Sequence, residues 1–172
     1  HHGILNQQNM YIEKTEKYYS ELLHEFERFA RIATYDTIEI NGSKYLNFHK
    51  IWPVIKQLIE ETLLVDPPIS LIHGDMCFSN ILVGLNPQTS VPIIRYIDPR
   101  GSFGLKGVFG DNRYDYAKLM HSYHGGYEYL IYDKFNVEQD GNKFVLEYSN
   151  KNKDEIENIF LSKLAKSSAI KL

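Results

Sequence analysis

The sequence predicts an α+β fold that is mainly helical and carries a small antiparallel sheet. Stretches whose apolar residues recur every three or four positions indicate helices toward both ends of the chain. Between them, three β-prone runs indicate strands: ISLIH, NILVG and PIIRYID. With 172 residues, 43% of them hydrophobic, the chain is long enough to bury one core. We therefore expect a single domain over 1–172, with helices and a hairpin in 1–69, site-bearing loops in 70–111 and a helical remainder in 112–172.

The first third of the chain predicts two helices around a hairpin. Residues 10–33 carry an apolar stripe at helical spacing that includes Tyr18, Leu22 and Phe26, which indicates one long helix. Asn41-Gly42 lies between two β-prone runs and suits the positive φ angles of a hairpin turn. Residues 50–64 again have helical spacing, and Pro53 fits only if it lies in the first turn of that helix. The pair Pro67-Pro68 should end the element.

The last part of the chain predicts a loop, a helix, a hairpin and a closing helix. Four glycines, Gly101, Gly104, Gly107 and Gly110, predict a flexible and closely approached backbone. Asp111 is placed to cap a helix that runs over 112–124 to a Gly-Gly pair. Asp140-Gly141 marks a second hairpin or a helix connection that carries one, and 153–170 has the pattern of an amphipathic helix.

Composition restricts the classes of partner. The net charge is −3 and no basic cluster stands out, so we expect no nucleic-acid partner. No run approaches the length of a membrane span and the start lacks a signal-peptide pattern, so we expect a cytoplasmic protein without a membrane partner. Cys77 is the single cysteine, which excludes an intramolecular disulfide, and we interpret it as a small buried residue.

Two carboxylates follow apolar, strand-like runs and form the candidate site. Asp75 comes after ISLIH, and Asp98 ends PIIRYID. Asn80 lies directly before the strand between them, so a tight loop could bring its amide oxygen beside Asp98. Pro99 biases Asp98 toward an extended backbone. A few hard oxygen donors suit Mg²⁺, which is usually completed by water and substrate phosphates.

These residues, in this order, resemble a known family. The segments LIHGDMCFSNILVG, YIDPRG and GDNRYDYAKL are similar to the aminoglycoside phosphotransferase and choline kinase group of small-molecule kinases, whose C-terminal lobe shares the protein-kinase fold. The similarity covers about residues 70–130. The segment DPRGSFG resembles the sequence of family members associated with surface-polysaccharide synthesis. The resemblance implies an ATP-dependent transfer of phosphate to a hydroxyl of a sugar, an amino alcohol or an aminoglycoside-like compound.

The resemblance also implies a role for each site residue. Asp75 would orient the substrate hydroxyl and accept its proton, while Asn80 and Asp98 would bind Mg²⁺ and, through it, the nucleotide phosphates. His73 would shape the loop through a hydrogen bond to backbone, and Asp115 would accept hydrogen bonds from the loop backbone. Arg100 could either contact phosphate or substrate, or brace the loop.

Several alternatives stay open beside this hypothesis. The chain has no glycine-rich β-lobe before His73, so the resemblance implies that an N-terminal lobe is missing and that this piece alone is inactive. A kinase-like module that binds a ligand or protein without catalysis is one alternative. A metal-dependent phosphate-ester hydrolase that uses Asp75, Asp98 and histidines is another. His121 and His124 have a spacing compatible with metal ligation, although packing or surface roles suit them better.

Overall fold

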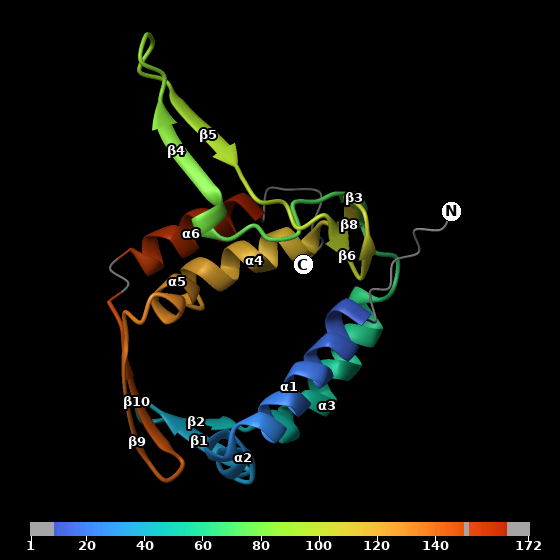
Figure 1. Cartoon of the computed structure of the whole chain (residues 1–172), viewed down its shortest axis with the longest axis vertical. Helices are drawn as coiled ribbons and strands as arrows, with labels where there is room; N and C mark the ends of the chain where they lie inside the picture. The colour runs from blue at the N-terminus through green and yellow to red at the C-terminus, as the bar shows by residue number, and fades with distance from the viewer. Residues whose placement is uncertain (1–8, 150–151, 165–172) are drawn as a thin grey trace. The chain divides into compact units, whose positions relative to one another are not determined.

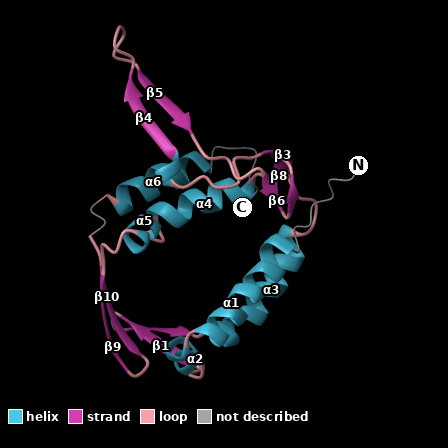
Figure 2. Ribbon diagram, in the orientation of Figure 1, coloured by secondary structure: helices cyan, strands magenta, loops and turns pink. Residues whose placement is uncertain are grey.

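The computed structural model describes residues 9–149 and 152–164 and has a mixed α+β architecture (Figure 1). The chain divides into two compact units. Of the described residues, 9–67 and 135–148 form one unit, and 68–134, 149 and 152–164 form the other. Within the described part of the chain, strands occur in four small sheets, where the sequence predicted one antiparallel sheet (Figure 2). No helix among the described residues is long and apolar enough to cross a membrane.

The first predicted helix is interrupted. A π-helical turn, Asn9–Glu13, leads into α1 (Lys14–Glu25), and α2 (Glu27–Ala33) follows after Phe26. Phe26 has an extended backbone, with φ −124° and ψ 99°, so the apolar stripe predicted over 10–33 is not on one continuous helix. Tyr18, Leu22 and Phe26 are exposed, whereas Tyr19 packs on Phe29 and Phe48. The apolar periodicity identified the helical segments correctly. The helix face that packs against other residues is the one next to the face that the periodicity indicated.

Helix α3 (Phe48–Leu58) begins after an asparagine cap and continues into a π-helical turn, Ile59–Leu63. The Asn47 side chain accepts a hydrogen bond from the Phe48 N–H and donates to the carbonyls of Ile32 and Tyr35, which fixes the start of the helix against α2. Pro53 lies inside the helix, beyond the first turn where the sequence placed it. In the turn before the proline, the Phe48 ring stacks on those of Trp52 and Tyr19.

Two hairpins that are far apart in the sequence form one four-stranded sheet. The predicted hairpins are confirmed as β1 (Thr37–Ile40) with β2 (Ser43–Leu46), and β9 (Asn136–Asp140) with β10 (Lys143–Glu147). β1 pairs in parallel with β10, which gives the order β2-β1-β10-β9. Asn41, with φ 50°, both donates to and accepts from the backbone of Leu146, so the turn residue also joins the hairpins.

Three short antiparallel pairs form the β-structure of the other unit. β3 (Ile69–Leu71) pairs with β8 (Phe109–Asp111), β4 (Ile81–Leu85) with β5 (Pro92–Tyr96), and β6 (Ser102–Phe103) with β7 (Leu105–Lys106). The three predicted β-prone runs thus overlap β3, β4 and β5. A Cβ added to Gly110 would clash with the Ile72 side chain and lie 2.8 Å from the Phe103 ring, which confirms a close backbone approach at this glycine.

Helices α4 (Arg113–Tyr123), α5 (Tyr127–Ile131) and α6 (Lys153–Leu164) complete this unit. Tyr123 is buried and packs on Phe160 of α6. Asp111 is not the N-cap that the sequence predicted, because it is the last residue of β8 and Asn112 occupies the cap position. Its fully buried carboxylate instead pairs with the Arg113 guanidinium at 2.7 Å and accepts the Arg113 N–H. The end of the last predicted helix, 165–170, lies outside the described residues.

Candidate functional site

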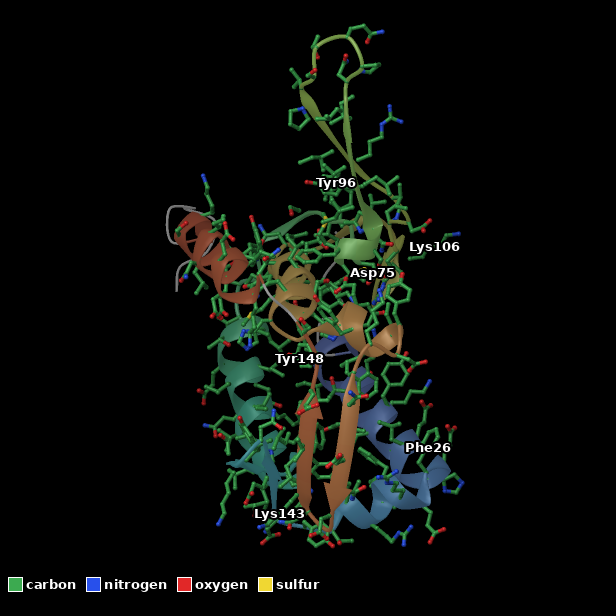
Figure 3. All side chains as sticks on the ribbon, turned by 90° about the vertical axis from the view of Figure 1, so that its left-hand side faces the viewer. Phe26, Asp75, Tyr96, Lys106, Lys143 and Tyr148 are labelled. Atoms are coloured by element: carbon green, nitrogen blue, oxygen red, sulfur yellow. The ribbon has the colours of Figure 1, made fainter. Side chains whose placement is uncertain are left out.

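The candidate site is the loop over residues 73–80, which connects β3 to a short 3-10 turn, Phe78–Asn80, at the start of β4. Figure 3 labels Asp75 in this loop. Gly74 has a φ of 77°, in the left-handed region that favours glycine, and a Cβ there would lie 3.0 Å from the Cβ of Arg100. A side chain at this position would meet both a backbone penalty and a tight contact, so the shape of the loop requires a glycine between His73 and Asp75.

Asp115 fixes the first half of the loop from α4. Its two carboxylate oxygens accept the backbone N–H groups of His73 at 2.7 Å and Gly74 at 2.8 Å. These are the loop-backbone hydrogen bonds that the resemblance implied for Asp115. Charge-assisted bonds to two successive N–H groups fix the orientation of the peptide that leads into Asp75.

The segment that contains Asp98 is attached to the same loop. The His73 ring nitrogen Nε2 lies 2.8 Å from the carbonyl of Ile97, the backbone contact predicted for this ring. The Ile97 N–H donates to the Asn80 carbonyl at 3.0 Å, and the Arg100 N–H donates to the His73 carbonyl at 2.9 Å. Asp98 therefore lies in a short stretch that is bonded to the loop on both sides.

The Asp75 carboxylate is half-buried and has two cationic neighbours. Its Oδ1 lies 2.9 Å from Lys118 Nζ and 3.6 Å from an Arg100 guanidinium nitrogen. Burial by itself would raise the pKa of Asp75, but the Lys118 hydrogen bond and the charges of Lys118, Arg100 and His73 outweigh it, so this pKa lies below its usual value. Asp75 is thus a fixed, ionised acceptor at neutral pH.

Asn80 is buried and uses one end of its amide to hold the loop. Its Nδ2 donates to the Asp75 carbonyl at 2.9 Å. Because the amide nitrogen is engaged in this way, the orientation of the side chain is set, and the oxygen Oδ1 is the atom that can bind a cation. The neighbouring N–H of Cys77 donates to the same carbonyl at 2.9 Å, so the backbone on the far side of Asp75 is fixed as well.

Asp98 is exposed and has a left-handed backbone. Its φ is 54°, so the extended conformation expected from Pro99 is wrong. Proline disfavours the right-handed helical region for the preceding residue, and aspartate is one of the few residues that tolerates the left-handed region. A non-glycine residue in this conformation costs of order 1–3 kcal/mol and is often found at functional sites.

Lys118 is the site residue that the sequence reasoning missed. It lies on α4, three positions after Asp115, and its side chain is only 16% exposed. Burial would lower the pKa of Lys118, but its hydrogen bond and ion pair with Asp75 raise it above the usual value. The three-residue spacing from Asp115, which puts both side chains on one helix face, is the signal that could have identified it.

Arg100 contacts the loop and α4 in the structure. Besides the Asp75 contact, its guanidinium donates to the Tyr114 hydroxyl at 3.1 Å and lies 5.8 Å from the centre of that ring. Its backbone N–H donates a hydrogen bond to the His73 carbonyl. Of the two roles expected for Arg100, the contacts present are those of a brace.

The remaining candidates have packing or ion-pair contacts. The His121 ring lies 4.5 Å from that of Tyr127, and His124 Nδ1 lies 3.3 Å from a Glu157 carboxylate oxygen. Burial, helped by the Lys118 charge, lowers the pKa of His121. Cys77 is buried, as expected, with its sulfur 3.2 Å from the Ser79 hydroxyl. Among residues 9–149 and 152–164, no group of three or more His, Cys, Asp or Glu side chains is placed to hold a metal ion.

Comparisons with known proteins assign no family. No protein-family model matches the chain, and neither a curated protein nor a solved structure matches it significantly.

Proposed function

We propose that this chain carries the catalytic half of an ATP-dependent phosphotransferase that acts on a hydroxyl of a small molecule, with Asp75 as the residue that orients the hydroxyl and accepts its proton. The observation that carries this proposal is the fixation of the backbone on both sides of the Asp75 side chain. Asp115 accepts the N–H groups of the two residues before Asp75, and Asn80 donates to the Asp75 carbonyl, while the cation of Lys118 lies beside the carboxylate. A carboxylate held in one orientation is what alignment of a nucleophile requires.

The low pKa of Asp75 fits an orienting role better than strong base catalysis. A carboxylate that is already ionised accepts a hydrogen bond from a hydroxyl, and takes the proton only as the oxygen–phosphorus bond forms. Phosphoryl transfer through a loose transition state needs little more than alignment and neutralisation of the phosphate charge. Both cationic contacts are made to Oδ1 of Asp75, so Oδ2 is the oxygen that would accept the hydroxyl.

Asn80 and Asp98 fit the requirements of a Mg²⁺ site completed by phosphate. One amide oxygen and one carboxylate are too few to enclose a cation, but Mg²⁺ commonly keeps several waters and takes one or two protein ligands plus substrate phosphates. The ion would supply charge neutralisation for the transferred group. The hydrogen bond from the Ile97 N–H to the Asn80 carbonyl keeps Asn80 and Asp98 on adjacent segments of backbone.

This proposal includes a kinase-like arrangement of the C-terminal lobe, in which β4, β5 and α4 carry the loops, and an N-terminal lobe that supplies the rest of the nucleotide site. The support for it is the order of Asp75, Asn80, Asp98 and Asp115 together with the contacts that join them. A role in surface-polysaccharide synthesis is a further part of the proposal and is supported by the DPRGSFG segment alone.

A second candidate function is ligand binding without catalysis. The observation that favours it is the neutralisation of Asp75 by Lys118 and Arg100, since an ion pair that is already satisfied can be purely structural.

One assay separates these functions. The product of the complete reading frame is incubated with γ-labelled ATP and Mg²⁺, with and without a panel of sugars and amino alcohols. Label transferred to a hydroxyl compound, and lost when EDTA is added, supports the phosphotransferase. Metal-dependent release of phosphate to water, unaffected by any acceptor, supports the hydrolase. Binding of Mg-ATP or of an acceptor with neither reaction supports the binding module.

A further inference from the structure

A cavity of about 570 Å³ lies next to the candidate catalytic loop, within the same compact unit. It is lined by Phe78 of the loop, by α4 and α5 residues and by the start of α6, including Ile156. The volume is within the range of roughly 300–1,000 Å³ that is typical of small-molecule sites. The cavity uses none of Asp75, Asn80 and Asp98, so it is a separate feature that needs its own explanation.

Three aromatic residues line this cavity together with Ile156. Phe78, Tyr129 and Tyr132 contribute rings to its wall, and Tyr132 is 58% exposed. An aromatic face packs well against a flat, apolar surface such as the C–H face of a sugar ring. Because an exposed ring is already in water, its packing against a ligand removes apolar surface from solvent without disturbing the protein core.

The charged groups of the cavity balance each other. Glu128 and Lys134 both line it, so the wall carries one carboxylate and one ammonium. The Glu128 oxygen Oε1 accepts from the Phe78 N–H at 3.0 Å and from the Ser122 hydroxyl at 2.9 Å, which fixes the carboxylate at the wall. The Lys134 ammonium lies 5.7 Å from the centre of the Tyr132 ring. A lining without net charge favours a neutral ligand that can both donate and accept hydrogen bonds over a strong cation or anion.

The same contacts connect the cavity to Asp75. Phe78 is three residues after Asp75, and its N–H is held by Ser122 and Glu128. Three consecutive Cα–Cα steps span at most roughly 11 Å, and the hydrogen bond from Cys77 to the Asp75 carbonyl shortens the path. Phe78 therefore places one wall of the cavity within three residues of Asp75 on the same loop.

We infer that this cavity is the acceptor site and that its ligand is a neutral polyhydroxyl compound of about the size of a monosaccharide. That the bound compound accepts phosphate rests on the proposed function. That the cavity binds a neutral sugar does not, because it follows from the lining of the cavity alone. Of the three acceptor classes considered, namely sugars, amino alcohols and aminoglycoside-like compounds, the inference retains only the sugars.

The test is a binding titration of the 172-residue chain without nucleotide. The probes are the methyl glycosides of glucose, galactose and mannose as neutral ligands, choline chloride as a cation and sodium glucuronate as an anion, each followed by saturation-transfer difference NMR. We expect saturable binding of at least one methyl glycoside, tighter than choline or glucuronate. Saturable binding of none of the glycosides, or tighter binding of either ion, overturns the inference.

Variants locate the binding. Tyr132→Ala should weaken the glycoside by at least tenfold, whereas Tyr45→Ala, which removes a similarly exposed ring from β2 in the other compact unit, should leave it unchanged. Equal effects of the two substitutions contradict the assignment to this cavity. Glu128→Gln removes the negative charge of the wall, so glucuronate should gain affinity relative to the glycoside; an unchanged preference contradicts the charge argument.

The experiments distinguish a failure of the inferred sugar site from a failure of the proposed phosphotransferase function. If the chain binds the glycoside but the complete protein transfers no phosphate to any hydroxyl, the sugar site stands and the phosphotransferase is wrong. If phosphate is transferred to choline and no glycoside binds, the phosphotransferase stands and the inference about the cavity is wrong.

Discussion

Asp75 and Asp98 follow strands of the same compact unit, but their surroundings differ. Asp75 is partly buried and its carboxylate is paired with Lys118. Asp115 accepts the N–H groups of the two residues before it, and Asn80 donates to its carbonyl. Asp98 is exposed and has a φ of 54°. The first arrangement holds one carboxylate in one orientation, whereas the second leaves a carboxylate accessible on a strained backbone. The difference suits a division of work in which Asp75 aligns a hydroxyl and Asp98 binds a cation that arrives with the nucleotide.

The largest effect on the folded state is expected from Asp115→Ala. The substitution leaves the N–H groups of His73 and Gly74 without their acceptor, at a cost of about 1–3 kcal/mol for each buried donor. We expect a lower midpoint of urea unfolding and a loss of the orientation of Asp75.

The matched control is Asp154→Ala, which removes a carboxylate from the first turn of α6. Both variants lose the favourable interaction of an acid with a helix N-terminus, but only Asp115 accepts hydrogen bonds from the loop. Equal destabilisation by the two substitutions would show that Asp115 does not hold the loop.

An intermediate effect is expected from Asp98→Gly. Glycine adopts a positive φ without steric cost but loses more entropy on folding, so the stability should stay within about 1 kcal/mol of the original. The affinity for Mg-ATP should fall at least tenfold in the complete protein, about 1.4 kcal/mol, because a metal ligand is removed.

Asp133→Gly is the control for this variant, since Asp133 is also an exposed aspartate with φ 52°. Calorimetric titration of Mg-ATP should distinguish the two. A Mg-ATP affinity that is the same in both variants would remove Asp98 from the metal site.

The smallest effect at neutral pH is expected from Lys118→Met. Loss of the Lys118 hydrogen bond and charge should raise the pKa of Asp75, although the carboxylate stays ionised at neutral pH. Because the folded-state pKa of Asp75 is below its unfolded value, its ion pair stabilises the fold above the unfolded pKa and this contribution is lost as the pH falls through the folded pKa. In the variant, the acid limb of the transfer rate should therefore lie at higher pH.

The pH profile of Lys163→Met, which removes a lysine from the last turn of α6, should match that of the unaltered protein. An acid limb that does not move in Lys118→Met would mean that Lys118 does not set the protonation of Asp75.

The local parts of this molecule could be predicted from the sequence, and the long-range parts could not. Asn41-Gly42 and Asp140-Gly141 identify two hairpins because the turn chemistry is contained in two residues, and both are present. The parallel pairing of β1 with β10 depends on contacts between residues about a hundred positions apart, which no local pattern encodes.

The same distinction applies to the candidate site. Asp75, Asn80 and Asp98 were found because they adjoin β-prone runs, and the backbone contact of His73 agrees with the expectation. Lys118 was missed because its partner is 43 positions away and its own segment has an ordinary helical pattern. The extended conformation predicted for Asp98 was wrong. A following proline only biases a residue toward an extended backbone, and the hydrogen bonds of Ile97 and Arg100 to the loop override that bias.

The most direct test of the central claim is the rate of phosphate transfer from Mg-ATP to a hydroxyl acceptor in Asp75→Asn, measured in the complete protein beside Asp154→Asn as control. Asparagine keeps the size of the side chain but cannot take the proton, so we expect a loss of about 10²–10⁴-fold with unchanged Mg-ATP affinity. The control should keep the original rate. A rate in Asp75→Asn equal to that of the control would contradict the assignment of Asp75 as the residue that orients and deprotonates the hydroxyl.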